Sequence, residues 1–254
     1  MRSRALFQCG LLAVWSFSVP AQDATSLYRE GLRLFAEGKS EAAAASLQQS
    51  LTIQPANASA WKALGVVFAT RGDYERAEPA FRNACERQPG LADACLYYGR
   101  SLYLLDRFAP AIDTLRGALK GRDTVEGHRL LALSLEALGR AAEAEPEFLA
   151  ALRLGDKTSP DEDPGIDYGV FLYRQGRTSQ ALEPLGAALE RHTDSARAHL
   201  ELGCVLLALD RLDEAARHLE RAVALHDSPR AHQLLAKTYL RQGKPEAAEG
   251  HLKR

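Results

Sequence analysis

The sequence lacks the features that mark a β-protein or a nucleic-acid-binding protein. β-Branched side chains are sparse and form none of the alternating runs that strands need. The formal net charge is −1, with 32 basic and 33 acidic residues, so the chain has no basic excess that would attract a phosphate backbone. We therefore expect no sheet and no nucleic-acid partner.

Catalytic and metal-binding motifs are missing as well. The chain contains no HExxH, no phosphate-binding glycine loop and no nucleophile elbow. Its seven histidines are dispersed, some at one place in a repeating unit and others near predicted helix ends, where solvated or capping roles dominate. The first group is His128, His199 and His232, and the second is His192, His218, His226 and His251. We predict that the protein is not an enzyme and has no catalytic residue, metal site, cofactor or small-molecule substrate.

What the sequence does contain is material for helices. Hydrophobic residues make up 46% of the 254 residues, which is enough for a sizeable core. The composition leans toward Ala, Leu, Glu and Arg, all of which favour helices. The chain is therefore predicted to be all-α.

Residues 1–21 have the pattern of a secretory signal. Arginines at positions 2 and 4 precede an apolar run that is short for a membrane span, and small residues end the segment at Ala21. We predict that this segment, with Cys9, is cleaved and that residues 22–254 form a periplasmic or secreted protein. The alternative is an uncleaved segment that anchors the protein in a membrane and is its only membrane contact.

A unit of about 34 residues recurs along the rest of the chain. Each copy has a small residue, a Gly or Asp seven residues later where a helix should stop, and an alanine where two helices should cross closely. The first position is Gly31, Gly65, Gly99, Ala132, Gly169, Gly203 and Ala236. The second is Gly38, Gly72, Asp106, Gly139, Gly176, Asp210 and Gly243. The third is Ala43, Ala77, Ala111, Ala144, Ala181, Ala215 and Ala248.

Large apolar residues stand at matching places in the same units. One large apolar residue follows each alanine of the third position by four residues, which puts both on one helical face. Each unit is therefore predicted to be a helix, a tight turn and a second helix, with large side chains packing against small ones. The large residues after the alanines are Leu47, Phe81, Leu115, Phe148, Leu185, Leu219 and Leu252.

This pattern resembles the tetratricopeptide repeat (TPR). The second unit carries most of the family signature, in Trp61, Leu64-Gly65, Phe68, Gly72, Tyr74, Ala77, Phe81, Ala84 and Pro89. The resemblance implies an all-α, TPR-type right-handed superhelical solenoid of about seven helix-turn-helix repeats. Their approximate ranges are 24–57, 58–91, 92–124, 125–158, 162–195, 196–228 and 229–254.

One unit is three residues longer than its neighbours. The extra residues fall within 155–164, which contains two prolines and four acids and is therefore predicted to be a loop. We interpret it as a tolerated surface insertion. The alternative is a change of superhelical angle between the first four repeats and the last three.

Solenoids of this family usually hold a peptide or a helix on a concave side lined by first helices. First-helix residues that are left once the packing positions are assigned therefore form our predicted ligand groove. Its apolar groups favour an amphipathic or extended segment, and its basic groups favour an acidic ligand. The predicted groove is Tyr28, Phe35, Lys62, Leu96, Arg100, Tyr103, Arg129, Ile166, Tyr173, Arg174, Arg197 and Leu200.

The sequence thus predicts a protein–protein interaction scaffold in an exported or envelope setting. Two alternatives stay open: a structural protein that self-assembles into a homo-oligomer through its C-terminal end, and a regulatory subunit of an enzyme complex.

Three cysteines lie beyond the predicted signal. Cys85 and Cys95 flank one predicted turn, so an oxidising compartment would favour a disulfide between them unless helix geometry keeps the sulfurs apart. Small buried core residues are the other interpretation of both, and of Cys204.

Overall fold

The computed structural model describes residues 23–91, 93–155 and 159–252, and all regular structure in these ranges is helical. The predicted signal, residues 1–21 with Cys9, lies outside them. The helices are α1 (Ala24–Ala36), α2 (Ser40–Ile53), α3 (Ala58–Ala69), α4 (Tyr74–Arg87), α5 (Ala94–Leu104), α6 (Phe108–Gly121), α7 (Val125–Ala137), α8 (Ala141–Leu154), the 3-10 helix η1 (Pro160–Glu162), α9 (Pro164–Arg174), α10 (Leu182–Arg191), α11 (Ala196–Ala208), α12 (Leu212–Leu225), α13 (Pro229–Arg241) and α14 (Pro245–Leu252).

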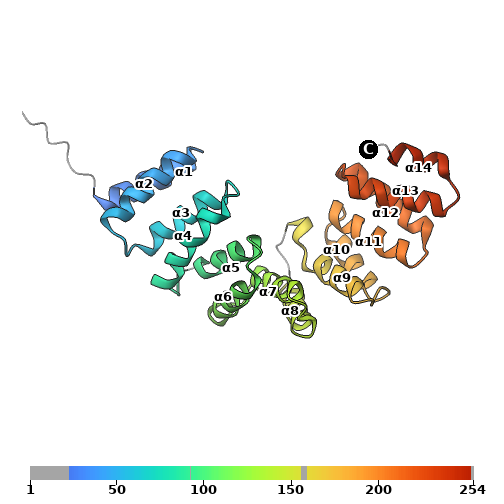
Figure 1. Cartoon of the computed structure of the whole chain (residues 1–254), viewed down its shortest axis with the longest axis horizontal. Helices are drawn as coiled ribbons and strands as arrows, with labels where there is room; N and C mark the ends of the chain where they lie inside the picture. The colour runs from blue at the N-terminus through green and yellow to red at the C-terminus, as the bar shows by residue number, and fades with distance from the viewer. Residues whose placement is uncertain (1–22, 92, 156–158, 253–254) are drawn as a thin grey trace, which may run out of the picture.

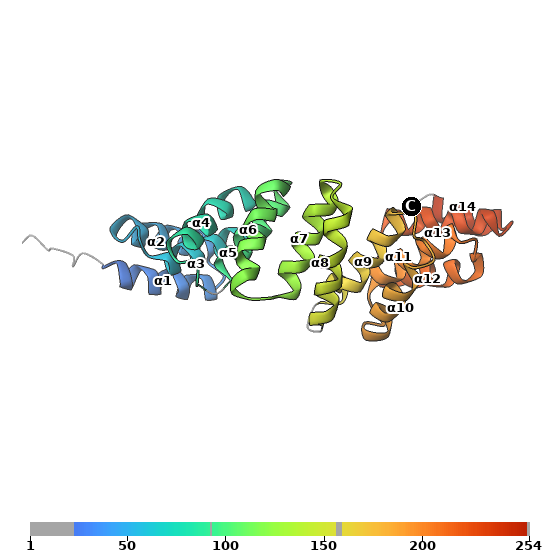
Figure 2. The same ribbon diagram turned by 90° about the horizontal axis from the view of Figure 1, so that it is seen from below.

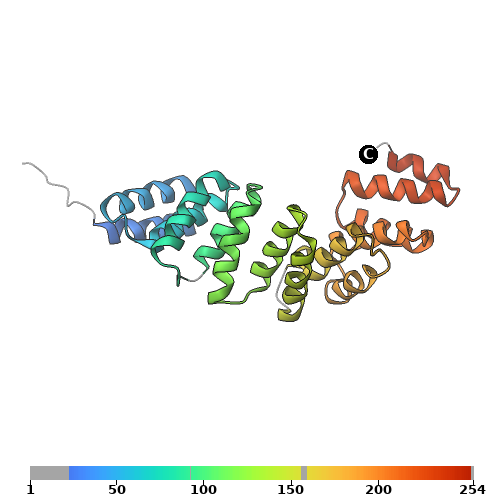
Figure 3. The same ribbon diagram turned by 60° about the horizontal axis from the view of Figure 1, so that its bottom comes forward.

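Consecutive α-helices pair into hairpins, from α1 with α2 to α13 with α14, and the hairpins stack into a curved array. In Figure 1, α7 and α8 lie at the bottom of an arc whose two ends rise on either side. Figures 2 and 3 show successive hairpins following one another along the same array. The predicted superhelical solenoid of about seven repeats is confirmed.

Each hairpin turn contains one residue with left-handed backbone, at each of the seven predicted helix stops. Five are glycines, and the other two are Asp106 and Asp210, with φ of 56° and 62°. In the first turn the N–H of Gly38 donates to Phe35 O and the N–H of Lys39 donates to Leu34 O, which satisfies carbonyls that the ending helix leaves open. The second helix therefore reverses direction at once.

Within each hairpin the two helices approach closely at the small position. A Cβ added at Gly99 would lie 2.6 Å from the side chain of Leu115, and one at Gly169 would lie 2.5 Å from Leu185. The alanines at the third repeat position are 0% exposed in all seven hairpins. Leu252 departs from the pattern of buried large residues, because it is 61% exposed on α14, where no further described helix packs against it.

The insertion is tied to the repeat that follows it. Asp163 accepts a 2.7 Å hydrogen bond from the N–H of Gly165 at the start of α9, and both of its oxygens accept from Arg191 at 2.9 Å. Asp161 accepts from the hydroxyl of Ser195 at 2.8 Å. The predicted loop therefore contains η1 and is held by its own acids; residues 156–158 lie outside the described part.

A disulfide joins the second hairpin to the third. Cys85 near the end of α4 and Cys95 at the start of α5 are bonded, with their Cα atoms 4.8 Å apart. Helix geometry therefore does not separate them. Cys204 is a free thiol, half-buried in α11.

Histidines form pairs at equivalent places in the last two hairpins. Nδ1 of His199 lies 3.0 Å from Nδ1 of His218, and Nδ1 of His232 lies 2.7 Å from Nδ1 of His251. The expectation that His218 and His251 are merely solvated or capping residues was therefore wrong, because a separation of 19 residues brings the two helices of a hairpin level.

The proton arrangement of the first pair follows from its neighbours. Nε2 of His199 lies 3.1 Å from the carbonyl of Thr193, which only accepts, so Nε2 carries a hydrogen and Nδ1 accepts from His218. Burial lowers the pKa of both His199 and His218. For His199 the hydrogen bond to the Thr193 carbonyl opposes this shift, the charge of Arg221 lowers the pKa further and that of Asp194 raises it. For His218, His199 and Arg217 lower the pKa and Glu214 raises it. The pair is therefore favoured in its neutral form.

Replacing Gly99 and Gly117 by alanine should shift stability in opposite directions. Gly99→Ala should destabilise the protein by roughly 1–3 kcal/mol, because the new methyl group overlaps Leu115. Gly117→Ala should stabilise it by roughly 0.5–1 kcal/mol, because nothing lies within 4 Å of that position in α6. Thermal denaturation of both variants is the measurement, and shifts of the same sign would contradict the close helix crossing.

The His199–His218 pair should make the protein less stable in acid. Because the folded-state pKa values of His199 and His218 lie below the ordinary value of 6.5, the stability they contribute is present above pH 6.5 and is lost as the pH falls below it. The melting temperature should therefore fall between pH 8 and pH 5. His218→Gln should narrow that fall by a few degrees, whereas His226→Gln, at an exposed position, should leave it unchanged. Equal falls in all three proteins would rule out a role for the pair.

Candidate functional site

The first helix of each repeat forms the inner face of the arc. Successive first helices from α5 to α13 contact one another directly, as do α1 and α3, whereas successive second helices of the described chain show no contact of comparable extent. Helices that touch on one side and separate on the other make the stack curve toward the touching side. The concave face is therefore lined by the first helices, α1, α3, α5, α7, α9, α11 and α13.

The predicted groove residues differ in how accessible they are. Arg100 and Arg174 are exposed, and eight others are half-buried: Tyr28, Phe35, Lys62, Tyr103, Arg129, Tyr173, Arg197 and Leu200. Leu96 is 9% exposed and belongs to the core. Ile166 is a correction, because it is 0% exposed and packs in the core, so no ligand reaches it. At the start of α9, Asp163 and the close packing at Gly165 hold the chain against α10.

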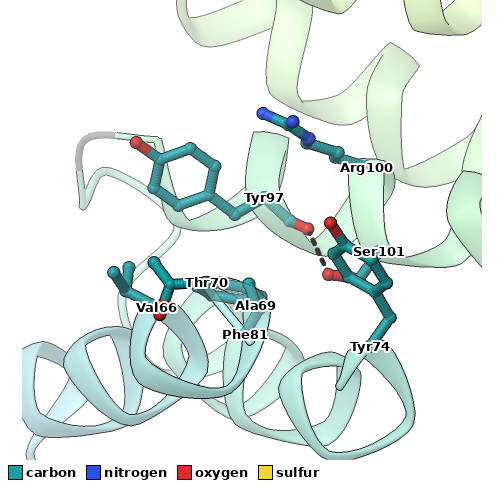
Figure 4. Close-up of a pocket in the computed structure, with 8 residues that line it drawn as sticks. All are labelled: Val66, Ala69, Thr70, Tyr74, Phe81, Tyr97, Arg100 and Ser101. Atoms are coloured by element: carbon teal, nitrogen blue, oxygen red, sulfur yellow. Dashed lines mark hydrogen bonds between the residues drawn. The ribbon is translucent and has the colours of Figure 1, made fainter. Parts of the chain in front are cut away.

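A cavity of about 270 Å³ opens between the second and third repeats. Its lining comes from α3, from the start and middle of α4, and from α5, and Figure 4 shows these side chains around the space. They are Val66, Ala69, Thr70, Tyr74, Phe81, Tyr97, Arg100 and Ser101. The walls are mainly apolar and aromatic, which suits an apolar side chain of a ligand.

Polar groups of this cavity have fixed positions. The Ser101 hydroxyl donates to the carbonyl of Tyr97 at 2.8 Å, drawn as the dashed line in Figure 4, and the Arg100 guanidinium donates to Glu126 at 3.0 Å. Burial raises the pKa of the Tyr97 phenol, and the charges of Asp93 and Glu126 raise it further. Tyr97 therefore keeps its hydroxyl proton at neutral pH, and the cavity offers a donor at its edge.

Sequence reasoning placed Arg100 in the groove but missed Tyr97. Tyr97 stands three residues before Arg100, so both project from one face of α5. That spacing was the available signal. The Phe81 ring, 5.3 Å from the Tyr97 ring between centroids, closes the cavity from α4.

The concave arginines of the later repeats are paired with carboxylates. Asp167 accepts from Arg129 at 3.0 Å and also from Arg197, although it is only 2% exposed. Arg174 donates to Glu136 at 3.2 Å. Burial raises the pKa of nearby Tyr103, with the Asp167 charge as the next cause. The arginines predicted to meet an acidic ligand therefore already have acidic partners within the chain.

These carboxylates were missed because their signal lies between repeats. Asp167 and Glu201 each stand two residues before the small position of their unit, and each meets an arginine about 30 residues later in the chain. A search within one helix does not reveal such pairs. Only the stacking of the repeats brings them together.

The described residues offer no group of three or more potential metal ligands. No helix in the described ranges is long and apolar enough to cross a membrane.

Family models of the tetratricopeptide repeat match residues 28–92, residues 68–133 and 172–237, and residues 125–148 and 229–254. The chain belongs to this family. Its repeats generally mediate protein–protein interactions, and the family is generally non-enzymatic.

Three solved structures show the same fold. A tetratricopeptide repeat protein from Parabacteroides merdae is 14% identical, with a TM-score of 0.73 and 91% of each chain covered. YrrB, a TPR protein with an unusual peptide-binding site, is 18% identical, with a TM-score of 0.56 over 76% of this chain and 97% of its own. Human IFIT1 with m7Gppp-AAAA is 21% identical, with a TM-score of 0.56 over 92% of this chain and 68% of its own. The chain spans about a third of the length of the first curated relatives it matches.

Proposed function

We propose that this protein is an exported scaffold that binds a peptide or helical segment of a partner protein along its concave face. The observation that carries this proposal is the cavity between α3 and α5, which is lined by apolar and aromatic groups on the inner side of the arc. A segment that places one large apolar side chain there loses water from both surfaces, which is the usual source of a binding hot spot.

Apolar groups also extend away from the cavity on the first helices. Leu32 on α1 and Leu104 on α5 are 40% and 41% exposed, and Phe35, three residues after Leu32, is half-buried. Accessible apolar groups on first helices suit the apolar side of an amphipathic segment. The peptide-binding site of YrrB, which shares this fold, is consistent with such a ligand.

A protein ligand fits this chain better than a nucleic acid does. Human IFIT1 was solved with m7Gppp-AAAA, so the fold can carry an RNA-binding site. Here, however, the chain has a net charge of −1. A phosphate backbone is attracted by an excess of basic residues, which this chain does not have.

The export part of the proposal rests on residues 1–21 and on the Cys85–Cys95 disulfide, since disulfides persist mainly in oxidising compartments. A reporter enzyme that is active only outside the cytoplasm, fused after residue 30, should become active in a bacterial host. Replacing Leu11 and Leu12 by Asp should abolish this activity, because charges in the apolar run of the segment prevent it from acting as a signal. Activity of the doubly substituted fusion equal to that of the unchanged one would refute the export signal.

The groove can be tested with a displayed library of random 12-residue peptides. The protein should enrich peptides that share a large apolar residue, and Val66→Asp should weaken their binding by about tenfold or more, because it places a charge in the cavity wall. Leu149→Asp is the matched control, since Leu149 is 40% exposed on the second helix α8. No enrichment, or equal binding by both variants, would rule out this groove. Circular dichroism should show equal helix content in both.

A further inference from the structure

A second cavity, of about 420 Å³, lies between the sixth and seventh repeats. Part of its lining is apolar, from α11, α12 and α13, and the remainder is polar. The apolar residues are Ala196, Leu200, Ala222 and Ala231, and the polar ones are Asp161, Arg197, Glu201, His226, Ser228 and Arg230. Arg197 and Leu200 were predicted groove residues, so this cavity continues the concave face toward the C-terminal repeats.

Two arginines of this cavity occupy the same place in successive repeats. Arg197 and Arg230 each stand six residues before the small position of their unit. Each is held by a carboxylate from the first helix of the preceding repeat: Arg197 by Asp167, and Arg230 by Glu201 through two hydrogen bonds of 2.6 and 2.9 Å. The hydrogen bonds that Arg230 donates to Glu201 raise the pKa of Arg230. The two guanidinium groups are therefore fixed in orientation before any ligand arrives.

Exposure separates the two members of each pair. The side chains of Arg197 and Arg230 are 34% and 56% exposed, whereas those of Asp167 and Glu201 are 2% and 9% exposed. A molecule entering the cavity therefore meets more of the two guanidinium groups than of their carboxylate partners, of which Glu201 also lines the cavity. Each guanidinium has five N–H donors and no acceptor, so its accessible edge can only be satisfied by an acceptor.

We infer that this cavity binds a Glu or Asp side chain of the partner segment, so that the segment is apolar where it crosses the second and third repeats and acidic where it crosses the sixth and seventh. This inference rests on the proposed function. A planar guanidinium matches the two oxygens of a carboxylate, and two such groups on one wall favour that class over a neutral amide. The apolar part of the lining suits the methylene groups of a Glu side chain.

Asp161 in η1 opposes this binding. It is exposed, it lines the cavity, and its carboxylate accepts hydrogen bonds from the Ser195 hydroxyl and from the backbone N–H of Arg197. Its charge lies beside the guanidinium that a ligand carboxylate would approach, since Arg197 Nη1 donates to the Asp161 carbonyl at 2.7 Å. Removing that charge should therefore strengthen the binding of an acidic ligand.

The test is fluorescence polarisation with a labelled deca-glutamate peptide at low salt, with deca-lysine as the opposite-charge probe. The full chain should bind deca-glutamate more tightly than deca-lysine. Arg230→Gln should weaken deca-glutamate binding by about tenfold, and Asp161→Asn should tighten it by about threefold. Arg221→Gln carries the same charge change on the second helix α12, where Arg221 is 49% exposed, and should have no effect.

The two substitutions are expected to change the affinity for deca-glutamate in opposite directions, which makes the result decisive. Loss of binding in Arg230→Gln alone could reflect misfolding, but tighter binding in Asp161→Asn cannot. Equal affinity for the two peptides would overturn the inference. So would an affinity for deca-glutamate that neither substitution changes. Tighter binding of a ten-residue oligothymidylate with the same loss in Arg230→Gln would also overturn it, in favour of phosphate. Val66→Asp should leave deca-glutamate binding unchanged, so failure of the apolar groove and failure of this cavity are distinguishable.

Discussion

The whole array depends on the close crossing of two helices inside each repeat. A side chain at Gly65 or Gly99 would overlap a large residue of the partner helix, Phe81 or Leu115. The glycine therefore allows the large side chain to pack directly against the backbone of the neighbouring helix. This contact fixes the angle of the hairpin. Five of the described hairpins share this contact at a glycine, and stacking such similar units produces an arc.

The curvature of the array determines which helices face its concave side. Most first helices touch their successors, and the exposed residues of the first helices line the concave surface. This surface is not uniform along its length. The second and third repeats supply apolar and aromatic walls, whereas the later repeats supply arginines held by buried carboxylates. The carboxylates neutralise charge inside the stack and also hold the arginines in place, so the same ion pairs contribute to packing and shape the surface.

Much of this fold could be predicted from the sequence, because local spacing determines it. The glycine and aspartate stops were predicted from a fixed distance to the small position, and all seven have left-handed backbone. The site was less predictable. Ile166 occupies a groove position in the repeat pattern, yet it is buried in the core, as is Leu96 at the same position of the third unit. The partners of Arg197 and Arg230 lie about 30 residues away, and only the geometry of stacking decides which carboxylate faces which arginine.

The disulfide between α4 and α5 has a mechanical consequence. A solenoid pulled from its two ends can unravel one hairpin at a time, since each repeat contacts mainly its neighbours. The Cys85–Cys95 bond closes a loop with a sequence separation of 10, and that stretch cannot lengthen while the bond persists. Under tension the second and third hairpins therefore stay tethered to one another at this point after their helices have come apart, and the extended chain is shorter in an oxidising environment than in a reducing one.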